Sequence, residues 1–278
     1  MIYDFHMHTT NSDGSLPPAE LVRLAKEAHA DIMCITDHDT MISINDAEKL
    51  NKAEKDIEIF GGLEISTYIK SANRHAHILA YRCDKNNAAL KNMVNITLRR
   101  RTDSFYESVD IINRHGDVYI DKNELEKYKT IDAMYKQHIL KYLLDIGYIS
   151  DMNGEERRKI FSRSTGYAFV AFEYPECTDA IQVVRNAGGI PVLAHTFYND
   201  NFHAVDEMIE AGLMGIEVYH PKHDEHQRAM LDEFCRRRGV LETCGSDFHG
   251  IFNDVDTEIG KTSVDNDKIR EFLSFLRG

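Results

Sequence analysis

The chain has 278 residues, of which 42% are hydrophobic, enough for one large core or for one barrel that carries an insertion. Its formal net charge of −13 disfavours general nucleic-acid binding, although a local cationic pocket could still hold a phosphate. The five cysteines include no C-x-x-C pair, and no apolar run approaches the roughly 18 residues of a membrane span. We therefore expect a cytoplasmic protein with no membrane partner; the oligomeric state stays open.

The first 84 residues alternate short apolar strands with amphipathic helices. Helices are predicted over 16–28, where prolines occupy the first turn, and over 42–55. Strands are predicted over 2–5, 31–36, 57–64 and 77–81.

Residues 85–180 break this rhythm and are electrically neutral, with 15 Lys/Arg and 15 Asp/Glu. Helical patterns cover 86–114, 132–146 and 155–163, and no convincing strand separates them. We interpret the segment as a helical insertion that forms a cap over the substrate pocket; a peripheral stabilising subdomain is the alternative.

The alternation resumes after residue 180. Helices are predicted up to 187, over 203–211 and over 223–238, with strands over 190–194, 215–219 and 240–245. Strands that alternate with helices indicate an α/β fold with a parallel sheet, here with enough units to close a barrel. The predicted domains are a barrel from 1–84 and 181–278, and the insertion 85–180.

Histidines and carboxylates recur where these strands end. The nine candidates for metal ligands are His6, His8, Asp13, His38, Glu64, His77, His195, Asp247 and His249. Imidazole and carboxylate together suit zinc, manganese and ferrous iron. Nine ligands are too many for one ion, so the pattern predicts a multinuclear site and hydrolytic chemistry.

Two pairs carry most of this prediction. His6 and His8 alternate on an extended segment, so both side chains leave the same face, and Asp247 and His249 repeat that spacing after the last strand. An isolated H-x-H is as often a pair of polar residues at a strand end as it is a metal-binding pair. Asp13, in the turn-forming N-S-D-G stretch, makes the metal interpretation persuasive.

Other residues in these motifs have candidate roles. Asp37, beside His38, is a candidate catalytic residue that orients an imidazole, as Asp39 could instead. Glu64 could bridge two ions, because each carboxylate oxygen can bind one. His220 could bind a substrate phosphate or act as an acid; a rim histidine held by hydrogen bonds is the alternative.

The motifs D-F-H-M-H-T-T-N-S-D-G, I-T-D-H-D, G-L-E-I-S, H-I-L-A-Y, V-L-A-H and G-S-D-F-H-G resemble those of the PHP (polymerase and histidinol phosphatase) superfamily, in the same order. The resemblance implies a distorted (β/α)7 barrel with two or three divalent ions, Mn, Fe or Zn. It assigns the first ion to His6, His8, Glu64 and Asp247, the second to Glu64, His77 and His195, and the third to Asp13, His38 and His249.

The sequence is more similar to the branch of stand-alone nucleotide phosphatases with a helical insertion. Members of that branch hydrolyse nucleotide phosphates, including 3′,5′-bisphosphates, and in some cases short RNA from the 5′ end. Where the branch commonly reads R-P-H, this chain has Lys136-Gln137-His138, which keeps a positive charge but loses the two-pronged fit of arginine to phosphate. Arg100, within the run Arg99–Arg101, is the candidate that compensates; a solvated helix face is the alternative.

The sequence thus predicts a metal-dependent phosphoesterase. Its substrate would be a nucleotide or another small phosphorylated metabolite, attacked by metal-activated hydroxide. Arg100, Lys136, His138 and His220 are the candidate substrate-binding residues. The alternatives are a 5′–3′ exoribonuclease on short RNA, then a histidinol phosphatase, then a metal-binding module without catalysis.

Overall fold

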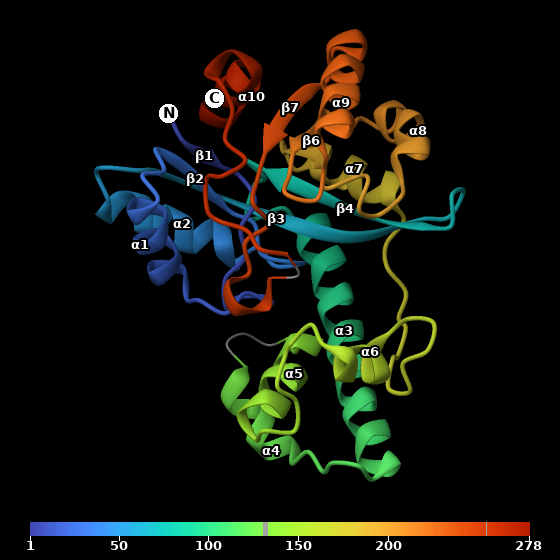
Figure 1. Cartoon of the computed structure of the whole chain (residues 1–278). Helices are drawn as coiled ribbons and strands as arrows, with labels where there is room; N and C mark the ends of the chain where they lie inside the picture. Colours follow the sequence, from blue (N-terminus) through green and yellow to red (C-terminus); the bar gives the residue numbers. More distant parts are fainter. Residues whose placement is uncertain (130–132, 254) are drawn as a thin grey trace. The chain divides into compact units, whose positions relative to one another are not determined.

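The computed structural model describes residues 1–129, 133–253 and 255–278, and its chain divides into two compact units. The barrel unit comprises Met1–Asn95 and Tyr174–Gly278, and the helical unit comprises Ile96–Glu173 (Figure 1). The helical unit lies within the insertion predicted over 85–180. That these units correspond to the predicted domains stays a prediction.

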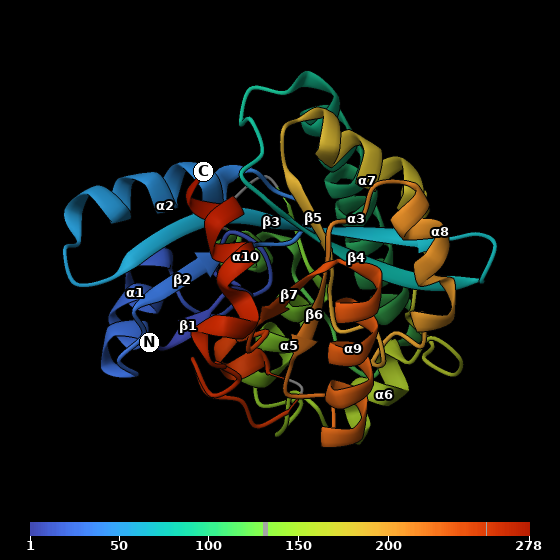
Figure 2. The same ribbon diagram turned by 90° about the horizontal axis from the view of Figure 1, so that it is seen from above.

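The barrel unit is built on one seven-stranded sheet whose strands follow one another in chain order (Figures 1 and 2). The strands are β1 (Tyr3–Asp4), β2 (Ile32–Ile35), β3 (Glu58–Ile69), β4 (Arg74–Tyr81), β5 (Ile190–Leu193), β6 (Gly215–Tyr219) and β7 (Leu241–Cys244). The amide of Phe5 donates to the carbonyl of Cys244 at 3.1 Å, and Met7 forms a parallel bridge with Phe248. These contacts bring the two edges together, so the predicted α/β barrel is confirmed.

The direction of β4 differs from the predicted parallel sheet. The strands β1, β2 and β3 are parallel, as are β5, β6 and β7, but β4 runs antiparallel to both of its neighbours. Strand β3 continues past Glu64 to Ile69, and only residues 70–73 separate it from β4. A parallel connection needs a crossover of about a dozen residues, so this short turn forces a hairpin.

Helices surround the sheet of the barrel unit (Figure 2). They are α1 (Pro18–Glu27), α2 (Ile42–Ala53), α7 (Cys177–Asn186), α8 (Val205–Glu210), α9 (Glu225–Arg238) and α10 (Asn266–Arg277), with 3-10 turns η2 (Phe202–Ala204) and η3 (Gly250–Phe252). Local signals explain their ends. Asp224 and Gln227 form a capping box at the start of α9, and Gly239 ends that helix in the left-handed conformation.

Helix α10, which the sequence pattern did not predict, completes the core of the barrel. Its Phe272 is fully buried and lies edge-to-face against Phe5 and Tyr81, at ring-centroid distances of 5.0 and 5.1 Å. Ile269, Leu273 and Leu276 join the same cluster. The helix therefore ties the first strand to the middle of the sheet.

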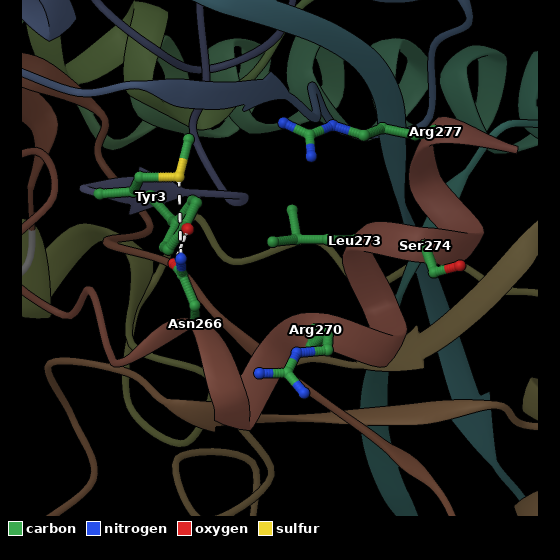
Figure 3. A pocket seen from close by; sticks show the side chains of 7 residues that line it. Tyr3, Asn266, Arg270, Leu273, Ser274 and Arg277 are labelled. Carbon is green, nitrogen blue, oxygen red and sulfur yellow. Dashed lines mark hydrogen bonds between the residues drawn. The ribbon is translucent and has the colours of Figure 1, made fainter.

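A surface hollow of about 340 Å³ lies where α10 meets the beginning of β1. Figure 3 shows its lining, which consists of Met1, Tyr3, Asn266, Arg270, Leu273, Ser274 and Arg277. The Tyr3 hydroxyl donates to Asn266 inside it. Its arginines already pair with the carboxylates of Asp267 and Glu58. The hollow adjoins the first residue of β1, whereas His6 and His8 follow the last.

The helical unit contains most of α3 (Ala88–His115), which begins in the barrel unit, followed by α4 (Lys122–Leu125), η1 (Glu126–Tyr128), α5 (Lys136–Asp145) and α6 (Glu155–Phe161). As predicted, no strand forms in the described part of this unit. Position 132, where one helical pattern was predicted to begin, lies outside the described residues. Across the described chain, no helix has the length and apolar character that crossing a bilayer requires.

Candidate metal centre

The nine predicted ligands converge on one end of the barrel unit. Seven follow strand ends: His6, His8 and Asp13 after β1, His38 after β2, His195 after β5, and Asp247 and His249 after β7. The other two, Glu64 and His77, lie within the β3–β4 hairpin. Glu64 and His38 are joined by a parallel bridge, so the loop after β2 docks directly on β3.

The carboxylate of Glu64, which is fully buried, lies at the centre of the cluster. Its Oε2 lies 3.1 to 3.2 Å from three imidazole nitrogens, those of His6, His8 and His38. Its Oε1 lies 2.8 Å from His77 Nδ1 and 2.9 Å from His195 Nε2. One carboxylate thus faces five imidazoles, which is the arrangement expected of a bridging ligand.

Three groups of side chains place their ligand atoms within 4.8 Å of one another. They are His6, His8, Glu64 and Asp247; His8, Asp13, His38 and His249; and His38, Glu64 and His77. The first equals the set that the resemblance implied, and the second adds His8 to the implied third set. The remaining group contains His38 with Glu64 and His77; His195, which the resemblance implied there, is not in that group but lies 2.9 Å from Glu64 Oε1.

Two of the predicted ligands have an unusual backbone. Asp247 has φ of 54° and His195 has φ of 29°, values that residues with a side chain rarely adopt. The Asp247 amide donates to the His6 carbonyl at 2.9 Å, which holds the loop after β7 against the loop after β1. Backbone strain of this kind clusters at functional sites because the surrounding structure must compensate for it.

Glu217, in β6, was not singled out from the sequence and supports two of the ligands. It is fully buried, and its Oε1 accepts from His6 Nδ1 at 2.9 Å while its Oε2 accepts from the His195 amide at 2.9 Å. A carboxylate on Nδ1 leaves the Nε2 lone pair of His6 for a cation and fixes the ring. An acidic residue at the centre of the apolar strand G-I-E-V-Y was the signal that could have revealed it.

Gly245 allows this close packing. A side-chain carbon at this position would lie 2.3 Å from His6 Cβ and 2.6 Å from Glu217 Oε1, far inside contact distance. Glycine is therefore required directly after β7, where the chain passes close to the His6–Glu217 pair.

The electrostatics of the cluster favour bound cations. Burial alone would raise the pKa of Glu64, yet His38 and His6 hold it well below its usual range. Burial also opposes the charge on Asp247, but His6 and His249 hold the pKa of that carboxyl well below its usual range. Burial opposes a charge on His8, but hydrogen bonds to Asp247 and Glu64 raise its pKa to about 10. Burial lowers the pKa of His38 to about 3. Glu64 and Asp247 as anions and His38 as a neutral ring are in the protonation states that metal ligands need, whereas a cation that binds His8 would have to displace a proton from it.

The donor atoms themselves also fit divalent ions. Nε2 of His6 lies 3.1 Å from Nε2 of His8, so two imidazole nitrogens converge on one point beside Glu64. The buried Nδ1 of His8 makes no hydrogen bond to any described residue. Buried polar atoms are normally satisfied, so such an atom points to a ligand that completes the site. Nitrogen and oxygen donors of this kind suit divalent transition metals.

The two candidate catalytic residues occupy different surroundings. His220 is fully buried after β6; its Nδ1 accepts from the Lys222 amide at 3.1 Å, and its Nε2 lies 3.6 Å from Asp247 Oδ2. Asp37 accepts hydrogen bonds from the hydroxyls of Thr9, Ser12 and Ser43, at 2.6 to 2.7 Å. Asp37 therefore organises the loop that carries Asp13, and the catalytic role predicted for it stays a prediction.

The remaining predicted residues belong to the helical unit. Arg100 is partly exposed and donates to the carbonyl of Glu173 at 2.9 Å. Lys136 Nζ lies 4.0 Å from the centre of the Phe169 ring. Burial and neighbouring arginines lower its pKa to about 8. His138 is buried, and its Nδ1 accepts from the Tyr135 amide, which caps α5. Their contact with substrate stays a prediction.

Comparison with known proteins identifies the family. The PHP domain matches residues 4–174, which include six of the nine predicted ligands. The chain belongs to the PHP domain family. A solved structure from Bifidobacterium adolescentis, provisionally described as a metal-dependent phosphoesterase, matches this PHP protein with a TM-score of 0.87 and 25% identity, over 98% of this chain and 96% of that one.

Curated relatives place this PHP protein among phosphoester hydrolases. A phosphoribosyl 1,2-cyclic phosphate 1,2-diphosphodiesterase of Eggerthella lenta is 30% identical over 92% of this chain and 97% of the relative. A 5′-3′ exoribonuclease of Haemophilus influenzae is 30% identical over 89% of each. A 3′,5′-nucleoside bisphosphate phosphatase of Chromobacterium violaceum is 26% identical over 88% of this chain and 86% of the relative. The PHP protein is a metal-dependent hydrolase of this class.

Proposed function

We propose that this PHP protein hydrolyses a phosphate ester on a ribose that carries a second phosphate, with a nucleoside 3′,5′-bisphosphate as the representative substrate. The reaction class rests on one observation, the three ligand groups that share His8, His38 and Glu64. Shared ligands hold cations close together, and closely spaced divalent ions are a recurrent device for phosphate-ester hydrolysis.

The proposed centre holds two or three divalent ions, Mn, Fe or Zn. His6, His8, Glu64 and Asp247 would hold one, Asp13, His38 and His249 with His8 a second, and Glu64, His77 and His195 with His38 a third. Such ions supply positive charge to phosphate oxygens and lower the pKa of water. The chain itself orients the imidazoles, above all through Glu217, and removes the site from bulk water.

The substrate class rests on what the named activities of the relatives have in common. A phosphoribosyl cyclic phosphate and a nucleoside 3′,5′-bisphosphate each carry two phosphate groups on one ribose, and an exoribonuclease cleaves phosphodiesters between riboses. Arg100, Lys136, His138 and His220 are the proposed contacts to the phosphates. The surroundings of Lys136 support this role, because its ammonium group is partly buried and lies near the like charges of Arg101 and Arg163, a setting that attracts an anion.

A 5′–3′ exoribonuclease on short RNA is the second candidate, because a relative with that name matches this chain over 89% of the relative's length. Both candidates use the same ligand groups and differ in what lies beyond the first nucleotide. The net charge of −13 favours the small substrate, because longer RNA is normally held by an extended basic surface.

Two readouts with the protein loaded with Mn²⁺ test the proposal: release of inorganic phosphate from the phosphate monoesters, and release of nucleoside monophosphates from the trinucleotide. The substrates are adenosine 3′,5′-bisphosphate, adenosine monophosphates, ribose 5-phosphate, histidinol phosphate and a 5′-phosphorylated trinucleotide. We expect the bisphosphate to have the highest kcat/KM. A higher kcat/KM for the trinucleotide would establish the exoribonuclease instead, and one for histidinol phosphate would establish a histidinol phosphatase. No turnover of any of these substrates with Mn²⁺, Fe²⁺ or Zn²⁺ would refute the proposed substrate class.

A further inference from the structure

Lys222, which follows β6, reaches the metal centre from the barrel unit itself. Its side chain is 12% exposed, and its Nζ lies 3.9 Å from Asp247 Oδ2. The same Nζ lies 3.6 Å from the centre of the Tyr198 ring, a cation–π contact that holds the ammonium group in place. Tyr198 in turn lies edge-on to the ring of His195, with centroids 5.8 Å apart. Lys222 is thus a positioned cation beside the predicted ligand Asp247.

Asp247 divides its surroundings into two sides. Its Oδ1 faces imidazole nitrogens of His6, His8 and His249, at 3.3 to 3.5 Å. Its Oδ2 faces His220 Nε2 at 3.6 Å and Lys222 Nζ at 3.9 Å. A cation bound on the Oδ1 side would partly neutralise the Asp247 carboxylate and so weaken the attraction between Asp247 and Lys222. An anion bound at the same place would lie within reach of the ammonium group.

His220 presents a second hydrogen-bond donor on that side. Its Nδ1 accepts from the Lys222 amide, so the proton of the neutral ring resides on Nε2, which points toward Asp247 Oδ2. Nε2 is buried and makes no hydrogen bond to the described residues. The short segment after β6 therefore offers one charged donor and one neutral donor to the same point.

We propose that Lys222 binds the phosphate that is hydrolysed, with its ammonium group on a non-bridging oxygen and with His220 Nε2–H donating beside it. The inference rests on the proposed function. In the reaction, the oxygen of water forms a bond to phosphorus, the bond from phosphorus to the ribose oxygen breaks, and that oxygen leaves with a proton as the alcohol. Negative charge on the non-bridging oxygens must be balanced throughout, and a fixed cation in a buried site does this strongly.

Two substitutions of Lys222 and one matched control test this assignment. Lys222→Met keeps the length of the side chain without its charge, and Lys222→Arg keeps the charge. Lys261→Met removes an exposed lysine that pairs with Glu258 on the same unit. For each Mn²⁺-loaded variant, the metal content, kcat/KM and inhibition by inorganic phosphate are measured, with adenosine 5′-monophosphate and adenosine 3′,5′-bisphosphate as substrates.

We expect Lys222→Met to keep its metal and to lose about 100- to 1,000-fold in kcat/KM with both substrates. Inorganic phosphate should inhibit it at least about tenfold more weakly, and Lys222→Arg should recover part of both losses. Kinetics of Lys222→Met equal to those of Lys261→Met would overturn the proposal. So would a loss confined to the bisphosphate, which would assign Lys222 to the second phosphate, or a loss of bound metal.

A different result would reveal failure of the proposed function. If the wild-type protein hydrolyses neither substrate, titration calorimetry with inorganic phosphate still compares the metal-loaded wild type with Lys222→Met. Tighter phosphate binding by the wild type would support the Lys222 site without the activity. Equal binding would refute it.

Discussion

Replacing Glu217 with glutamine should weaken metal binding without unfolding the protein. Glutamate accepts two hydrogen bonds at this position, from the His6 ring at 2.9 Å and from the His195 amide at 2.9 Å. A glutamine has one acceptor oxygen, so its NH2 group must face one of the two donors. The fully buried ring of His6 also loses the negative charge that stabilises its Nδ1–H.

The size of the effect follows from these contacts. A hydrogen bond to a charged group contributes about 1.5–3 kcal/mol, and one such bond is lost. Loss of a carboxylate behind a ligating histidine typically weakens metal binding about 10- to 100-fold, which is about 1.4–2.7 kcal/mol and so agrees with that range. We therefore expect the Kd for Mn²⁺ of Glu217→Gln to rise by this factor.

Competition with a chromophoric chelator measures this Kd directly. Glu210→Gln, a substitution of an exposed glutamate on α8, is the matched control and should bind Mn²⁺ as the wild type does. Circular dichroism confirms that both variants are folded. The same Kd for folded Glu217→Gln and for the wild type would refute the role assigned to Glu217.

Three further predictions concern the barrel unit. Burial and the neighbouring Asp232 raise the pKa of Glu242 from 4.5 to about 7. Protonated Glu242 therefore stabilises the folded protein fully below pH 4.5, and this part of the free energy of unfolding is lost as the pH rises through 7. In urea unfolding, Glu242→Gln should therefore reduce the loss of unfolding free energy between pH 4.5 and pH 7 by about 1 kcal/mol, a small value because the group is partly exposed. The same pH profile for the variant and the wild type would contradict this prediction. Phe272→Ala should lower the free energy of unfolding by about 3–5 kcal/mol, whereas Phe275→Ala, at an exposed position, should cost less than about 1 kcal/mol. Gly245→Ala should displace the His6 ring and weaken Mn²⁺ binding in chelator competition, and unaltered binding would show that the loop can shift freely.

Much of the site could be predicted because ligand spacing and strand position are local features. His6 and His8 sit two residues apart on extended chain, and the end of a parallel strand defines where they point. The convergence of Glu64 with His38 and His195 follows from the order of the strands, which the alternation of elements indicated.

Other features depend on contacts between distant segments and could not be predicted. The antiparallel direction of β4 follows from a four-residue turn that periodicity does not reveal. Glu217 reads as an ordinary polar residue in a strand until His6, 211 positions away, is placed beside it. Lys222 lies at the start of a charged segment, and only the fold brings it to Asp247.

Phosphate release by the Glu64→Gln variant tests the central claim most directly. Glu64 faces five imidazoles and belongs to two of the three ligand groups, so its loss should disrupt the proposed centre more than the loss of an outer ligand. With adenosine 3′,5′-bisphosphate, we expect activity of the wild type to disappear on chelation and to return with Mn²⁺, and the folded variant to stay inactive under both conditions. Release by the metal-stripped wild type, or full activity of the variant with Mn²⁺, would contradict the account.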